Sequence, residues 1–131
     1  MDLKVLLLAA CCLACTNPAA VSPAGTDPVA LYPGSPEGDS ALLRGRLELE
    51  GPCLYILSSE TGERWLAAFP APATVWVAEE RAVRIGARMV RVGATGAFGG
   101  GESAGTVTWS RPPHAACDAR KIWRVTTIDA P

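Results

Sequence analysis

The chain has 131 residues, a length that allows one small domain rather than several. Its net charge of -1 and sequence pI of about 5.8 provide no overall basic field, which argues against a protein that binds nucleic acid through its phosphates. Its five cysteines are many for this length, and their roles depend on the compartment in which the chain folds.

The first fourteen residues have the order of a secretory signal. Lys4 precedes an apolar run from Val5 to Ala14, and small residues stand before Cys11 and Cys15. This run is shorter than the roughly 20 residues that cross a bilayer. It resembles the signal of bacterial lipoproteins, in which the cysteine after the cleavage site carries the lipid. The resemblance implies export to the cell envelope, facing the periplasm or exterior, and membrane anchoring by palmitate-type lipid at Cys15, with Cys11 as the alternative.

We expect three parts along the chain. Residues 1–14 form the lipoprotein-type signal peptide, residues 15–40 a Pro-rich flexible linker, and residues 41–131 a β-barrel domain. The linker contains little large apolar surface to bury and carries five prolines among small and polar residues. About ninety residues remain for the domain, which is enough for one small core.

The expected domain consists mainly of strands. From Leu43 to Glu50, apolar or small residues alternate with Arg and Glu, which predicts a strand with one buried face. A turn at Gly51-Pro52 follows. Further strands are predicted at Cys53–Leu57, Arg64–Phe69, Thr74–Ala78 and Ile122–Ile128, with a polar loop over Ser58–Glu63.

Residues 79–92 admit two interpretations. Arginines and apolar residues recur at helical spacing, which is compatible with an amphipathic helix. The β-branched Val83, Ile85 and Val90 and the central Gly86 favour two short strands around a turn. We predict the two strands, with the arginines on a solvated face.

Short strands with Gly and Pro turns predict a mainly β fold, a small antiparallel OB-like barrel or sandwich. At Leu43–Leu57, Val90–Gly101 and Cys117–Val125, the chain resembles small bacterial envelope proteins with an OB-like barrel. That resemblance implies a fold and a location, and it carries no activity or cofactor.

Two cysteines, Cys53 and Cys117, remain once the signal cysteines are removed or lipidated. Exported compartments favour oxidation, so we expect a disulfide between them. The alternative is a metal site that adds His114, whose spacing from Cys117 suits a ligand pair, but this set is one ligand short of a closed zinc site.

The tryptophans and the glycine-rich stretch indicate roles in the fold rather than a binding or catalytic site. Four tryptophans are expected mostly to fill the core, with a stacking surface as the alternative: Trp65, Trp76, Trp109 and Trp123. The glycines near Gly99–Gly101 lack the pattern of a phosphate loop and suggest a bulge or a close strand approach. We expect a mobile loop over Gly99–Thr106.

No catalytic constellation is recognisable in the sequence. His114 is the sole histidine, and the serines and aspartates around it fall in no motif that requires a triad. We therefore expect a noncatalytic module that contacts an envelope protein, polysaccharide or small ligand through Ser58–Glu63 and Gly99–Pro113, without nucleic acid. A structural accessory lipoprotein is the second hypothesis, and a hydrolase or metalloprotein that uses His114 is the third.

Overall fold

A computed structural model describes residues 27–34, 40–103 and 107–130 of the chain. The predicted signal and lipidation cysteines Cys11 and Cys15 lie outside the described residues. The elements in chain order are β1 (Ala30–Pro33), β2 (Ala41–Glu50), β3 (Cys53–Ser58), β4 (Arg64–Ala71), β5 (Thr74–Val77), the 3-10 turn η3 (Ala78–Glu80), β6 (Ala82–Ile85), β7 (Arg88–Arg91), β8 (Thr95–Ser103) and β9 (Ile122–Asp129).

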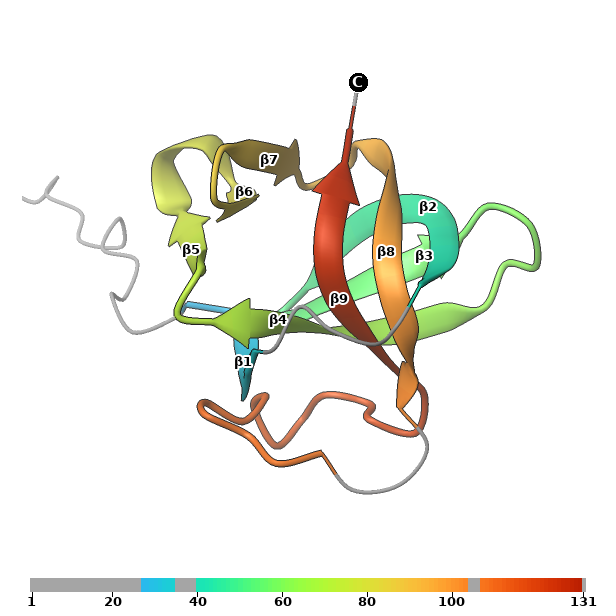
Figure 1. Cartoon of the computed structure of the whole chain (residues 1–131). Coiled ribbons are helices and arrows are strands. Elements are labelled where there is room, and N and C mark those ends of the chain that lie inside the picture. The colour runs from blue at the N-terminus through green and yellow to red at the C-terminus, as the bar shows by residue number, and fades with distance from the viewer. Residues whose placement is uncertain (1–26, 35–39, 104–106, 131) are drawn as a thin grey trace, which may run out of the picture.

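Five of these strands close a barrel (Figure 1). The ring runs β2-β3-β4-β9-β8 and returns to β2, and each neighbouring pair is antiparallel except β4 with β9. This is a five-stranded Greek-key barrel of the OB type, so the predicted small β-barrel is confirmed. The β4–β9 pair and the β1–β4 pair are parallel, which an all-antiparallel barrel would not contain.

The barrel interior follows from the two-residue period of its strands. On β2, Leu43 and Leu47 are buried, whereas Arg44 and Arg46 are exposed. The largest fully buried side chains include Phe69 and Phe98, contributed by strands on opposite parts of the ring. The polar face of the predicted alternation is therefore the outside of the barrel.

Strand β8 corrects one expectation. Residues Gly99–Ser103 belong to this strand rather than to a mobile loop, while residues 104–106 lie outside the described part. The register of β8 against β9 shifts between Gly99 and Gly100, and Gly100 has φ of 152°. A Cβ at Gly100 would collide with the backbone carbonyl of Arg124, so the glycine permits the bulge and the close approach of the two strands.

Strand β1 corrects another expectation, because it lies within the predicted linker. Val29 and Ala30 are 2% exposed, and β1 pairs with the second half of β4. The folded domain therefore includes residues ahead of Ala41. The first half of that same β4 edge pairs with β9, so β1 extends the sheet where β9 ends.

A second sheet, β5-β6-β7, lies at one end of the barrel (Figure 1). Strands β6 and β7 form a hairpin around Gly86-Ala87, so the prediction of two strands over residues 79–92 is confirmed. Val83 and Val90 are buried in the barrel core, with Trp76 packed against them. This sheet closes the end of the barrel with its apolar face.

No helix in the described ranges has the length and hydropathy that a membrane span requires.

Candidate functional site

The β8–β9 connection lies across the outer face of β3 and β4. Tyr55 on β3 and Leu66 on β4 point away from the barrel interior, because their neighbours in sequence fill the core. Val107 and Trp109 of the connection pack against them. We call this group the outer cluster, and its complete membership is Tyr32, Cys53, Tyr55, Leu66, Ala68 and Ile122 with Val107, Trp109 and Cys117.

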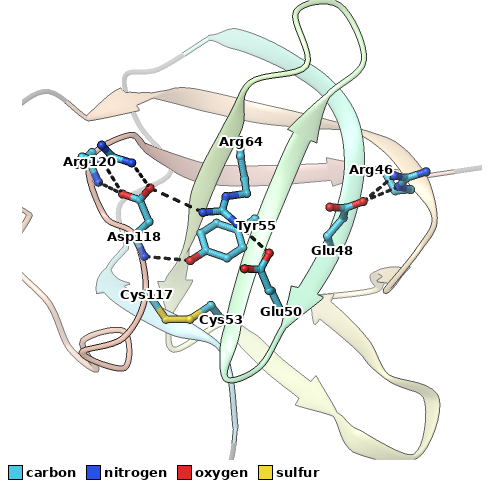
Figure 2. Close-up of polar contacts among 9 residues, drawn as sticks. All are labelled: Arg46, Glu48, Glu50, Cys53, Tyr55, Arg64, Cys117, Asp118 and Arg120. Atoms are coloured by element: carbon cyan, nitrogen blue, oxygen red, sulfur yellow. Dashed lines mark hydrogen bonds and ion pairs between the residues drawn. A yellow bond between two sulfur atoms is a disulfide. The ribbon is translucent and has the colours of Figure 1, made fainter.

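A covalent bond ties this connection to the barrel. Cys117 lies at disulfide distance from Cys53 on β3, with an Sγ–Sγ separation of 2.05 Å and a Cα–Cα separation of 5.6 Å (Figure 2). This is the pairing expected from the sequence. Cys53 is 4% exposed, so the bond is partly covered by the outer cluster.

The structure gives no support to the metal alternative. His114 is exposed, and its Nδ1 accepts the backbone N–H of Ala116 at 3.0 Å. Within the residues described, no group of three or more His, Cys, Asp or Glu side chains could hold a metal ion.

Polar contacts hold the same connection next to the disulfide (Figure 2). The backbone N–H of Asp118 donates to the Tyr55 hydroxyl at 2.9 Å. The Arg64 guanidinium lies 4.1 Å from the centre of the Tyr55 ring and pairs with Glu50 at 2.7 Å and with Asp118 at 3.7 Å. Covalent, aromatic and charged contacts thus converge on Cys117 and Asp118 of this connection. We call this group the clamp, and it consists of Glu50, Cys53, Tyr55, Arg64, Cys117, Asp118 and Arg120.

Asp118 is the electrostatic centre of the clamp. Arg120 donates to its two carboxylate oxygens through Nε at 3.0 Å and Nη2 at 2.8 Å. These bonds, a backbone N–H bond from Arg120 and the charges of Arg120 and Arg64 hold the pKa of Asp118 well below its usual range. The hydrogen bond to Glu50 likewise raises the pKa of Arg64.

An open hollow of about 510 Å³ lies beside the clamp, lined by Glu63, Arg64, Asp118, Arg120 and Lys121. Each of these side chains has a partner of opposite charge. Lys121 pairs with Glu63, and its hydrogen bond is the main reason that the pKa of Glu63 is lowered. The hollow therefore presents neutralised pairs and offers neither free cations to a phosphate nor free carboxylates to a metal.

The clamp has a direct consequence for ligand binding. OB-type barrels bind oligonucleotides and oligosaccharides on the face formed by their second and third strands. In this chain those strands are β3 and β4, and their outer face is covered by the β8–β9 connection. The part of the usual ligand surface around Tyr55 and Leu66 is therefore occupied by the protein itself.

The tryptophans do not form a stacking surface, and the prediction that they mostly fill the core is confirmed. Trp65 and Trp123 are buried and meet edge to face, with ring centres 5.7 Å apart. Trp76 packs against the barrel core and Trp109 against the outer cluster, both half-buried.

The loop Ser58–Glu63, expected to contribute to binding, is a compact turn. The Ser58 hydroxyl is buried and accepts the backbone N–H groups of Glu60 and Thr61, each at 3.2 Å. Ser58 therefore serves the turn and is not an exposed nucleophile. Among the described residues, His114 makes no hydrogen bond or ion pair with a serine, aspartate or glutamate, so no triad is assembled around it.

Sequence reasoning missed an apolar groove at the junction of β1, β4 and the second sheet. It has a volume of about 360 Å³ and is lined by Tyr32, Gly34, Pro70, Ala71, Pro72, Ala73, Ile85 and Thr126. The Tyr32 hydroxyl donates to the backbone oxygen of Val125 at 2.6 Å, so its ring forms a rigid wall. The groove was missed because Pro70 and Pro72 were interpreted only as the end of a strand and because Tyr32 lies in the predicted linker.

Comparison with protein-family models, with curated proteins and with solved structures found no match to this chain.

Proposed function

We propose that this chain is an exported, lipid-anchored envelope protein whose β-barrel acts as a noncatalytic interaction module. The supporting observation is the Cys53–Cys117 pair, which joins β3 to the β8–β9 connection across 64 positions of sequence. Such bonds form and persist in oxidising compartments outside the cytosol. The signal-like first fourteen residues support the same location.

The apolar groove is the proposed point of contact with a partner. Its volume lies near the lower end of the roughly 300–1,000 Å³ range of small-molecule sites, and apolar walls with few polar groups are typical of such sites. The hollow beside the clamp is a weaker candidate because its charges are already paired. We therefore expect an apolar side chain or small apolar group of an envelope component to enter the groove.

Labelling with palmitate tests the anchor. We expect the full chain to incorporate label and to fractionate with membranes, and Cys15→Ser to abolish both. Cys11→Ser serves as the matched control and should leave labelling intact. Recovery of an unlabelled, unprocessed chain from the soluble interior would contradict the proposal.

Filling the groove tests the interaction. Ala73 is exposed at the groove wall, so Ala73→Trp should fill the groove without disturbing the barrel core. Ala115→Trp, on the exposed β8–β9 connection, provides a bulky control away from the groove. We expect crosslinks to a specific envelope component that Ala73→Trp removes and Ala115→Trp retains, and equal crosslinking by both variants would refute the groove as the contact.

A structural accessory lipoprotein is the second candidate, because the β8–β9 connection is held in place and the surface charges around the clamp are paired. Such a protein would crosslink through the barrel surface independently of the groove. The hydrolase alternative predicts that His114→Ala abolishes a measurable activity, whereas the interaction module predicts no effect of this change.

A further inference from the structure

The second sheet carries charge of opposite sign to the rest of the chain. Of the 12 Lys and Arg and 13 Asp and Glu residues in the sequence, residues 74–92 contain four arginines and two glutamates. Eight basic and eleven acidic residues are left in the rest of the sequence, so residues 74–92 carry a net positive charge and the remaining sequence a net negative charge. This separation orients the molecule in the field of a charged surface.

The outward side of this sheet combines an arginine with apolar side chains. Val75 on β5, Arg84 on β6 and Met89 on β7 lie directly opposite one another across the three strands. Their sequence neighbours Trp76, Val83 and Val90 face the barrel core, so this row faces away from it. Val75 is 44% exposed, Met89 is half-buried and Arg84 is exposed.

Arg81, at the edge of the same sheet, adopts a backbone conformation that favours glycine. Its φ of 50° and ψ of 58° are left-handed, a region that side chains other than glycine enter at a cost. Both backbone polar groups of Arg81 are hydrogen-bonded within the turn. Its N–H donates to the backbone oxygen of Ala78 at 3.1 Å, and its oxygen accepts from the backbone N–H of Val92 at 2.8 Å. Glycine would make both bonds without strain, so the turn does not explain the arginine.

The arginines of the sheet differ in their partners. Arg91 pairs with Glu80 at 2.6 Å and Arg88 with Asp129 at 3.2 Å. Arg81 and Arg84 are exposed and make no ion pair or hydrogen bond through their side chains within the part of the chain that the structure describes. Glu79 is an exposed acid next to this group, and the sheet remains positive after it is counted.

We propose that the outward face of the second sheet, formed by Val75, Arg84 and Met89 with the exposed Arg81 next to it, docks onto anionic lipid headgroups of the membrane that holds the anchor. This inference rests on the proposed function for the anchor. Cys15 lies twelve positions before Asp27, and that number of residues can span no more than about 37 Å at about 3.1 Å per residue, which keeps the domain near the membrane. Unpaired arginines attract anionic headgroups, and Val75 and Met89 offer apolar contact at the interface. A soluble polyanion would match the charge and leave the apolar residues without a role.

Sedimentation with vesicles tests the proposal separately from the anchor. The probe is the chain from residue 15 onward with Cys15→Ser, which contains every described element and no lipid. We expect it to bind vesicles of phosphatidylcholine with one part in three phosphatidylglycerol, and not vesicles of phosphatidylcholine alone. A chain that is never lipidated in the cell would fail palmitate labelling and still bind these vesicles.

Variants distinguish docking from net charge. Arg81→Gly and Arg84→Ala should each weaken vesicle binding about fivefold, and the pair about 25-fold, because each arginine near the surface contributes about that factor. Arg81→Gly should also leave the unfolding temperature equal or higher, because it relieves the left-handed strain. Arg81→Lys should retain binding, and Arg46→Ala, which removes a cation paired with Glu48 on β2, should leave it unchanged.

Three outcomes would overturn the proposal. Equal binding to both vesicle types would show that anionic headgroups are not recognised. An equal loss of vesicle binding by Arg46→Ala would show that binding depends only on the net charge of the protein. Binding to a soluble acidic polysaccharide without binding to vesicles would assign the face to a different partner.

Discussion

Removing the Cys53–Cys117 bond should lower the free energy of unfolding by about 4 kcal/mol. The bond closes a loop of 64 positions, and the loss of loop-closure entropy in the unfolded chain gives this value. A domain of this size has a total stability of about 5–15 kcal/mol, so the change is a large share of it. The double variant Cys53→Ala with Cys117→Ala makes the perturbation permanent and leaves no free thiol in the barrel.

Urea unfolding followed by the fluorescence of the buried Trp65 and Trp123 measures this difference. The oxidised protein should unfold at a higher urea concentration than both the double variant and the same protein in dithiothreitol. The two forms that lack the bond should have the same free energy of unfolding. A difference below about 1 kcal/mol would refute the reasoning, because it would mean that restriction of the unfolded chain is not what the bond contributes.

Three smaller predictions concern the clamp and the start of the domain. Because Arg120 holds the pKa of Asp118 down, the stability from this carboxylate is present above the ordinary aspartate pKa of about 3.9 and lost as pH falls below it. Asp118→Asn should therefore flatten the fall in unfolding temperature below about pH 4, and an unchanged acid profile would contradict this. Tyr55→Phe should cost about 1–3 kcal/mol in urea unfolding, because it leaves the Asp118 N–H without its acceptor, and a neutral change would show that water replaces the hydroxyl. Arg111 donates to the backbone oxygen of Val29 at 2.9 Å, so Arg111→Ala should speed amide hydrogen exchange in β1 while β9 stays protected, and equal exchange in both proteins would remove this role.

The barrel was predictable where its strands have one wet and one buried face. Alternation along β2 marked the outside of the barrel by Arg44 and Arg46, and turn residues marked the hairpin to β3. The second sheet was predictable because β-branched residues flank Gly86, which has φ of 59°. In each case local chemistry and the final fold agree.

Strand β8 could not be read in the same way. Its inward positions include Gly96, Phe98 and Gly100, so a single large side chain carries the two-residue period. Glycine is needed at Gly100 because β9 passes too close for a side chain. The expected bulge and close strand approach at these glycines are confirmed, but glycines without large neighbours do not mark a strand, so Gly99–Ser103 was wrongly placed in a loop.

Strand β1 and the clamp depend on contacts that are remote in sequence. The short β1 pairs with the edge of β4, and Arg111, 82 positions from Val29, binds the residue just before it. The residues of β1 themselves lie among prolines. Counting cysteines predicted the pairing of Cys53 with Cys117. That the joined loop covers the outer face of β3 and β4 follows from the barrel topology, which no local pattern contains.

The mass of the protein isolated from the cell envelope tests the central claim most directly. The proposal predicts a chain that begins at an acylated Cys15 and gains the mass of two hydrogen atoms when the Cys53–Cys117 bond is reduced. A chain that retains Met1, carries two free thiols and is recovered only from the soluble interior would contradict export, anchoring and the envelope role together.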